Sequence, residues 1–203
     1  MVKILQLCHV QNCLLLAHAW GCYSRVARSL QICPFMKMSH FRFVHILNYQ
    51  SIMAHTGELP LIPQLLQHVA EHDYAHAPAI LIYYHAAHCL MGQGEGHFEP
   101  LNTLLQQHAE RFTQEEARSM YGMAQNYCIR QINSGNGQYM DALLGIYRSL
   151  LQSGIILEKG ELSPWDFKNI VAVALRCGET DWTLQFINKF NQHIAPEHRD
   201  NAI

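Results

Sequence analysis

The sequence lacks the short motifs by which common catalytic and nucleotide-binding sites are recognised. It has no P-loop, no G-x-G-x-x-G, no G-x-S-x-G and no H-E-x-x-H. Each of those motifs holds a nucleophile, a metal ligand or a phosphate-binding backbone at a fixed spacing. Without them, nothing in the sequence favours a nucleotide-dependent enzyme, a serine hydrolase or a zinc protease. We predict a protein that is not an enzyme and that carries no cofactor.

Paired cysteine motifs are missing as well. The chain has seven cysteines, but no two of them form a C-x-x-C pair. An odd number argues against a complete disulfide framework, and most of these cysteines lie in apolar helical patterns, where a free cysteine behaves as a small hydrophobic residue. This usage is typical of a reducing compartment, so we expect a cytoplasmic protein.

Long apolar runs are also absent. The opening stretch, MVKILQLCHVQNCLLLAHAWGC, is interrupted by His9, Gln11 and Asn12. The apolar residues that remain are too few for a membrane span and make a poor hydrophobic region for a signal peptide. We predict an opening helix and no transmembrane segment.

Acidic residues are missing from the first 57 positions. That stretch has five lysines and arginines and a net charge of +5, whereas residues 58–203 have nine basic and 16 acidic residues and a net charge of −7. The whole chain carries −2, which argues against a general binder of polyanions. The acidic second part lacks the positive charge that supplies most of the affinity for nucleic acid, and this disfavours RNA and DNA as partners.

What the sequence does contain is a regular helical pattern. Four glycines divide it into units: Gly57, Gly96, Gly137 and Gly178. They stand 39, 41 and 41 residues apart, and each lies between two stretches whose apolar residues recur every three or four positions. The octets LLQHVAEH (65–72) and LLQQHAER (104–111) are then the same part of the second helix in successive units. We predict an all-α fold, an α-solenoid of about four antiparallel helix hairpins with a repeat of 39–41 residues.

Signals for helix starts agree with this prediction. Thr113 and Glu116 have the spacing of a capping box, and Ser163-Pro164 offers an N-cap followed by a proline in the first turn. The repeat domain is predicted to span residues 36–203, after a helical N-terminal segment, residues 1–35, that matches a fifth hairpin weakly. The last residues, APEHRDNAI, look like the start of another first helix. This predicts either a fragment of a longer array or self-association through the incomplete C-terminal repeat.

Three segments carry a family resemblance: LNTLLQQHAERFTQEE, NYCIRQIN and LSPWDFKNIVAVALRCGETDW. They resemble an uncharacterised family of helical-repeat proteins from Bacteroidota. More broadly, residues 39–195 are similar to the tetratricopeptide and pentatricopeptide class of α-solenoids, although the W-x2-L-G-x2-Y signature is absent and the unit is longer. The resemblance implies a helical-repeat fold and implies no activity.

One arrangement of histidine and cysteine residues suits a metal ion. The chain has 14 histidines, and His85, His88 and Cys89 stand at i, i+3 and i+4 of a predicted helix. Side chains with that spacing share a helical face, and imidazole and thiolate are the ligands that zinc prefers. A metal site or metal-dependent enzyme at these residues is one alternative. We favour ordinary surface or partly buried side chains, because no carboxylate set accompanies them.

The first helices offer side chains suited to a protein or peptide ligand. Aromatic residues and arginine are frequent anchors of protein interfaces. Seven residues are expected to line the concave face: Tyr83, Tyr84, His88, Asn126, Tyr127, Arg130 and Asn169. We predict a non-enzymatic scaffold that binds a protein or peptide there. RNA binding is the other alternative, because Asn126 and Asn169 fall at equivalent places, as in repeats that read one base per unit. Trp165 and Trp182 are predicted to pack in the core or between repeats.

Overall fold

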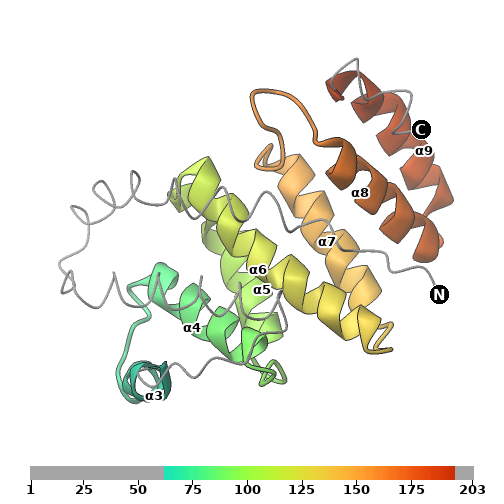
Figure 1. Ribbon diagram of the computed structural model, residues 1–203. Helices are drawn as coiled ribbons and strands as arrows, with labels where there is room; N and C mark the ends of the chain where they lie inside the picture. Colours follow the sequence, from blue (N-terminus) through green and yellow to red (C-terminus); the bar gives the residue numbers. More distant parts are fainter. Residues whose placement is uncertain (1–61, 195–203) are drawn as a thin grey trace.

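The computed structural model describes residues 62–194, and these residues are predominantly helical (Figure 1). Within this range the chain forms seven α-helices and two short 3-10 helices, and it forms no β-strand. The predicted all-α fold is therefore confirmed for residues 62–194. The N-terminal segment 1–35, the helix expected before Gly57 and the last nine residues lie outside the described residues.

The helices coincide with the amphipathic stretches that follow Gly57 in the sequence. Their bounds are α3 Ile62–Glu71, α4 Pro78–Leu90, α5 Phe98–His108, η1 Ala109–Arg111, α6 Gln114–Asn133, α7 Tyr139–Gln152, α8 Pro164–Arg176, α9 Thr180–Phe190 and η2 Asn191–His193. Every stretch read with a period of 3.6 in this range is helical, as predicted. None of the helices in residues 62–194 combines the length and the hydropathy that a membrane crossing requires.

Two helix starts carry the predicted caps. The Thr113 side chain accepts a hydrogen bond from the backbone N–H of Glu116, and the Glu116 carboxylate accepts one from the backbone N–H of Thr113, which completes the capping box of α6. Ser163 caps α8, and its hydroxyl accepts a hydrogen bond from the backbone N–H of Trp165. These bonds satisfy N–H groups that have no partner within the helix, so they fix where α6 and α8 begin.

The helix ends differ from the predicted glycine pattern. Helices α4, α6 and α8 are each followed, one residue past the C-cap, by a glycine with positive φ: Gly92, Gly135 and Gly178. These glycines stand 43 residues apart, not 39–41. Gly137 was predicted to end a helix but lacks a positive φ and lies in the turn before α7, and Gly96 lies in the turn before α5. The chain turns at the first glycine after each of these helices, because glycine adopts the left-handed conformation without a clash of a Cβ atom.

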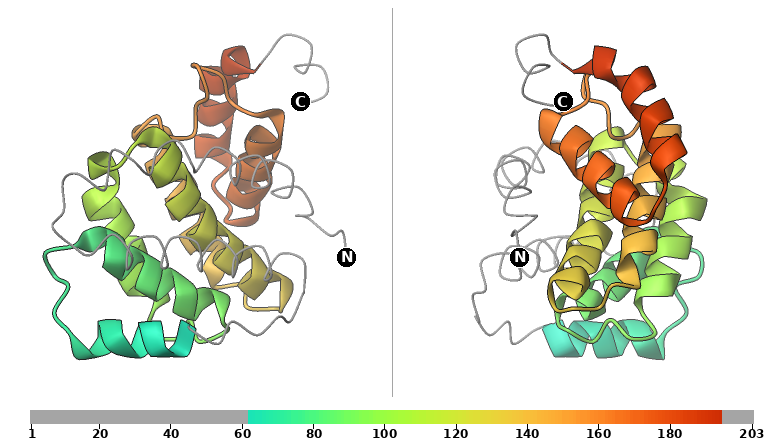
Figure 2. Two further views of the ribbon diagram at one scale, coloured as in Figure 1. Left: turned by 60° about the vertical axis from the view of Figure 1, so that its left-hand side comes forward. Right: turned by 90° about the vertical axis from the view of Figure 1, so that its right-hand side faces the viewer.

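The helices pack as pairs, and the contacts between successive pairs differ along the chain. Within residues 62–194, α4 packs with α5, α6 with α7, and α8 with α9, while α3 lies against α4. Helix α6 contacts both α4 and α5, whereas α8 contacts the preceding pair mainly through α7 (Figure 2). One large cluster of buried side chains nevertheless runs from Ile62 to Ile194. The described helices therefore share a continuous interior.

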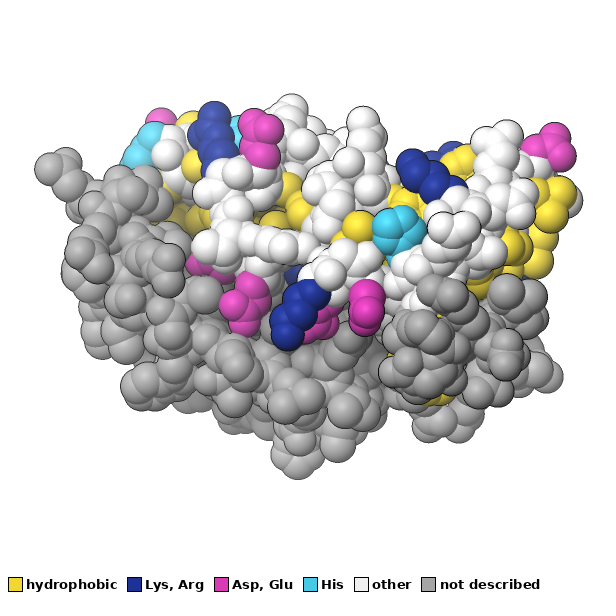
Figure 3. All heavy atoms as spheres, turned by 90° about the horizontal axis from the view of Figure 1, so that it is seen from above, with side chains coloured by type: hydrophobic (Ala, Val, Ile, Leu, Met, Phe, Trp, Pro, Cys, Tyr) yellow, Lys and Arg dark blue, Asp and Glu magenta, His cyan; other side chains and the backbone are white. Residues whose placement is uncertain are grey.

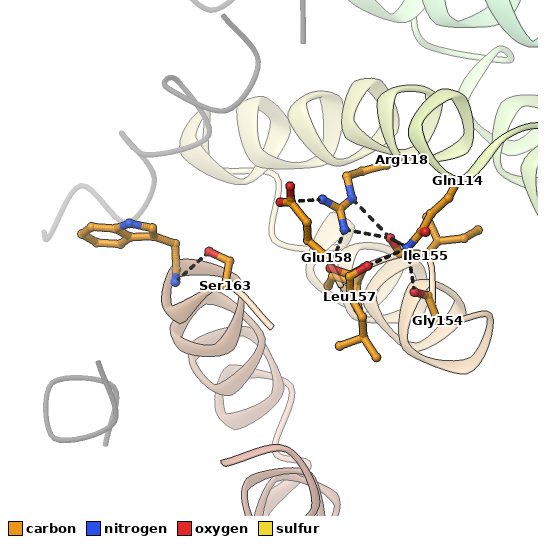
Figure 4. Close-up of polar contacts among 9 residues, drawn as sticks. Gln114, Arg118, Gly154, Ile155, Leu157, Glu158 and Ser163 are labelled. Carbon is orange, nitrogen blue, oxygen red and sulfur yellow. Dashed lines mark hydrogen bonds and ion pairs between the residues drawn. The ribbon is translucent and has the colours of Figure 1, made fainter. Parts of the chain in front are cut away.

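Polar side chains of α6 hold neighbouring pairs together. Near its start, Gln114 donates hydrogen bonds to the carbonyl oxygens of Gly154, Ile155 and Leu157, and Arg118 donates to those of Ile155 and Ile156. Figure 4 shows both side chains reaching from α6 to this loop between α7 and α8. Arg118 also forms an ion pair of 3.5 Å with Glu158. These bonds set the path of the long connection that leads into α8.

Candidate functional site

Three of the seven residues predicted to line a concave face are instead buried. Tyr83, Asn126 and Tyr127 belong to the interior, and the Tyr127 ring stacks on Phe98 with centroids 5.3 Å apart. The Tyr127 hydroxyl lies 3.4 Å from that of Tyr139. A protein or peptide ligand cannot reach these side chains, because their helix faces point toward the neighbouring helices. The prediction of surface positions is corrected for these three.

The other predicted residues divide between structural and partly exposed positions. Arg130 donates hydrogen bonds to the carbonyl oxygens of Leu90, at 3.0 Å, and Cys89, at 2.6 Å, so its guanidinium links α6 to the end of α4. Asn169 is half-buried on α8, away from the rest. Only Tyr84 and His88 come together at the surface, and the structure adds two further histidines to them.

A cluster of aromatic and imidazole rings forms where α4 turns into α5. The Nδ1 atoms of His85 and His97 lie 3.0 Å apart, and the His88 and His97 rings stack with centroids 3.9 Å apart. The Tyr84 ring packs edge-on against the three histidines, at 4.7–5.6 Å. The Nδ1 atom of His88 lies 2.9 Å from the Gln93 side-chain oxygen. We call Tyr84, His85, His88 and His97 the histidine cluster.

The turn between α4 and α5 explains why His97 joins this cluster. Tyr84, His85 and His88 lie within about one turn of α4, and His97 is the residue immediately before α5. The intervening turn, Met91–Gly96, reverses the chain and brings His97 back over α4. The sequence offered no signal for this contact, because His97 is separated from His88 by a turn whose path local patterns do not define.

Burial and mutual proximity favour the neutral form of His85 and of His97. Burial, followed by the nearby His97 and His88, lowers the pKa of His85 from 6.5 to about 4. Burial and the nearby His88 also lower the pKa of His97. A proton on His85 or His97 would be partly withdrawn from solvent and would face other imidazoles. His85 and His97 are therefore expected to resist protonation in the folded state.

Cys89 does not complete the alternative metal set His85/His88/Cys89. Its side chain is buried against the core, and burial raises the pKa of the thiol to about 12, with a small opposing effect of Arg130. The Cys89 side chain belongs to the buried core cluster, whereas His85 and His88 are partly exposed. Among residues 62–194, no group of three or more His, Cys, Asp or Glu side chains could hold a metal ion.

Acidification is expected to weaken the fold through His85. The folded pKa of His85, about 4, lies below its ordinary value of 6.5, so the unfolded chain binds more protons between these values. The contribution of neutral His85 to the free energy of unfolding is complete above pH 6.5 and is lost as the pH falls toward 4. Allowing for the partial exposure of His85, we expect it to contribute about 1–2 kcal/mol.

Urea unfolding at a series of pH values, followed by circular dichroism, measures this effect. The His85→Gln variant should lose part of the pH dependence between pH 7 and pH 4.5 that the unaltered chain shows. His76→Gln is the matched control, because His76 is exposed outside the cluster. Identical pH dependences for the unaltered chain and His85→Gln would contradict the prediction.

A second candidate surface lies on the C-terminal pair of helices. Four large hydrophobic side chains in the described part of the chain are exposed: Met91 at 39%, Trp165 at 50%, Leu175 at 51% and Leu184 at 55%. The last three belong to α8 and α9, and Figure 3 shows hydrophobic side chains exposed at this end of the molecule. Trp165 was predicted to pack in the core or between repeats and is instead half exposed, whereas Trp182 packs on the core, stacked on Phe186 at 5.5 Å.

The exposure of Trp165 follows from its place on α8. The buried residues of that helix, Phe167, Ile170 and Val173, define an apolar side. At 100° per residue, Trp165 falls nearly opposite that side. The helical spacing could therefore have identified Trp165 as a surface residue.

Comparison with known proteins identifies no relative of this chain. No protein-family model matches the chain, and no curated protein and no solved structure matches it. The resemblance to helical-repeat proteins of Bacteroidota therefore stays a prediction, and the function has to be argued from the exposed side chains of α8 and α9.

Proposed function

We propose that this protein is a non-enzymatic scaffold, built from helix pairs in the manner of an α-solenoid, that binds a protein or peptide. The observation that supports it is the exposure of Trp165, Leu175 and Leu184 on the last described pair, α8–α9. Large exposed hydrophobic side chains that gather on one region mark interaction sites, and tryptophan is a frequent anchor of binding energy. The proposed surface differs from the concave face expected from the sequence, whose tyrosines are largely buried.

The arrangement of the helices suits a binding scaffold. The buried cluster is continuous through the described helices, so α8 and α9 are held on a common interior. Gln114 and Arg118 of α6 fix the loop that enters α8. A surface held in place before binding loses less conformational entropy when a partner arrives.

Capture of partners from an extract of the source cells tests the proposal. The tagged full chain is compared with a variant that carries Trp165→Ser and Leu175→Ser. We expect at least one protein to be retained by the unaltered chain and its recovery to fall by about tenfold or more with the double variant, since truncating hot-spot residues costs about 1–2 kcal/mol each.

The control is Met91→Ser, which removes an exposed hydrophobic side chain far along the sequence from α8. This variant should retain the same proteins as the unaltered chain. Circular dichroism should show equal helix content for all variants. Recovery that is unaffected by the double variant, or no specific capture at all, would count against a scaffold acting through α8–α9.

A further inference from the structure

One side of α8 is open to solvent along its length. Trp165, Lys168, Ala172 and Leu175 recur at intervals of three or four residues, so they lie along one side of the helix. Trp165 and Leu175 are half exposed, Lys168 is exposed and Ala172 is partly exposed. The opposite side of α8 is buried through Phe167, Ile170, Val173 and Ala174. We call the first side, together with the adjacent exposed Arg176, the open face of α8.

The charged side chains of the open face carry one sign. Lys168 and Arg176 are both cations, and the Lys168 ammonium lies 6.0 Å from the centre of the Trp165 ring. The one carboxylate of α8, Asp166, is partly buried and lies off the open face. Burial raises its pKa to about 6, against a smaller lowering by Arg118. The open face therefore presents apolar side chains flanked by positive charge.

We propose that the open face of α8 docks an acidic amphipathic helix of a partner protein. The proposal rests on the scaffold function above and names the class of its ligand. Trp165 and Leu175 are ten residues apart, about 15 Å along the helix, which is the span of apolar side chains at i, i+3, i+7 and i+10 of a bound helix. Glutamate or aspartate beside those anchors would face Lys168 and Arg176, and opposite charges guide the association.

The same charges argue against a second copy of this chain as the occupant. Pairing one open face with another would bring Lys168 and Arg176 near the same cations of the copy. Like charges across an interface are unfavourable, and no carboxylate of α8 lies on this face to offset them. A partner with acidic flanks removes that conflict.

Two designed peptides test the proposal with the full chain. Both are fluorescein-labelled peptides of about 20 residues with leucines at the same helical positions. One has glutamate and the other lysine at the remaining positions. Fluorescence anisotropy at low ionic strength should show the glutamate peptide binding about tenfold or more tightly than the lysine peptide.

Variants locate the binding. Trp165→Ser should lower the affinity for the glutamate peptide by about tenfold or more. Lys168→Glu should shift the binding preference toward the lysine peptide. Met91→Ser, at the far hairpin turn, should change neither affinity. Equal binding of the two peptides, or an affinity for the glutamate peptide that Trp165→Ser leaves unchanged, would overturn the proposal.

Two other occupants are distinguished in the same set of measurements. Poly(U) RNA that binds the unaltered chain and is lost with Lys168→Glu would assign the face to nucleic acid and overturn the proposal. If light scattering shows a dimer that becomes a monomer with Trp165→Ser, the open face of α8 binds a second copy of the chain. That result would also overturn the proposal. If capture from the cell extract depends on Trp165 but the glutamate peptide does not bind, the proposal of an acidic helix is wrong and the proposal of a scaffold is retained. If capture from the extract fails as well, both proposals are wrong.

Discussion

Replacing Arg130 with methionine is expected to lower the free energy of unfolding by about 2–3 kcal/mol. The partly buried guanidinium donates hydrogen bonds to the carbonyl oxygens of Leu90 and Cys89. Those carbonyls end α4, where positive charge is favourable, and the Cys89 oxygen also accepts a hydrogen bond from the backbone N–H of Gly92 at 3.3 Å. Methionine fills a similar volume but donates no hydrogen bond. The end of α4 would then lose its hydrogen bonds to α6, while the packing of the two helices remains.

Urea unfolding followed by circular dichroism measures the loss. Arg130→Lys should lie between the unaltered chain and Arg130→Met, because an ammonium keeps the charge but not the two-pronged geometry of the guanidinium. Arg111→Met is the control at an exposed arginine, where we expect a change within about 0.5 kcal/mol. A loss with Arg130→Met no greater than with Arg111→Met would mean that these hydrogen bonds contribute nothing net.

Replacing Gly94 with alanine is expected to destabilise the fold by about 1–3 kcal/mol. A Cβ atom at this position would overlap the hydroxyl and ring carbons of Tyr127. The ring has no free space to move into, because it is buried, stacked on Phe98 and packed edge-on against Tyr139. The backbone of the turn between α4 and α5 must therefore shift, and the packing of α5 on α6 shifts with it.

A double-mutant comparison separates this clash from other effects of alanine. Tyr127→Leu removes the ring, so Gly94→Ala should cost about 1 kcal/mol less in that background than in the unaltered chain. Gly145→Ala is a control that should change the free energy of unfolding in the opposite direction. Gly145 lies inside α7 with nothing within 4 Å of an added Cβ, and alanine there should stabilise by about 0.5–1 kcal/mol. Additive effects of Gly94→Ala and Tyr127→Leu would contradict the proposed contact.

Local signals in the sequence were enough to predict the helices. The capping box of Thr113 and Glu116 and the cap at Ser163 appear at the predicted positions. Both depend on groups within three residues of each other, so a single sequence contains the information. The glycine pattern was less decisive, because SGNG, residues 134–137, offers two glycines and only Gly135 takes the left-handed conformation.

The candidate surfaces depended on contacts that no local signal carries. Amphipathic periodicity identifies an apolar side, but it does not tell which aromatic or polar residues a neighbouring helix will cover. Tyr127 and Asn126 were expected at the surface and are buried, whereas Trp165 was expected in the core or between repeats and is half exposed. His97 joined the histidine cluster only because the turn after α4 folds back.

The sequence by itself determined where this chain is helical and where several of its helices begin, because capping and apolar periodicity act within a few residues. The tertiary structure decided which faces are covered and which are open. Arg130 reaches Leu90 and Gln114 reaches Leu157 across 40 and 43 residues. Contacts at that separation exist only once the helix pairs have packed, and they leave the outer side of α8 exposed to solvent.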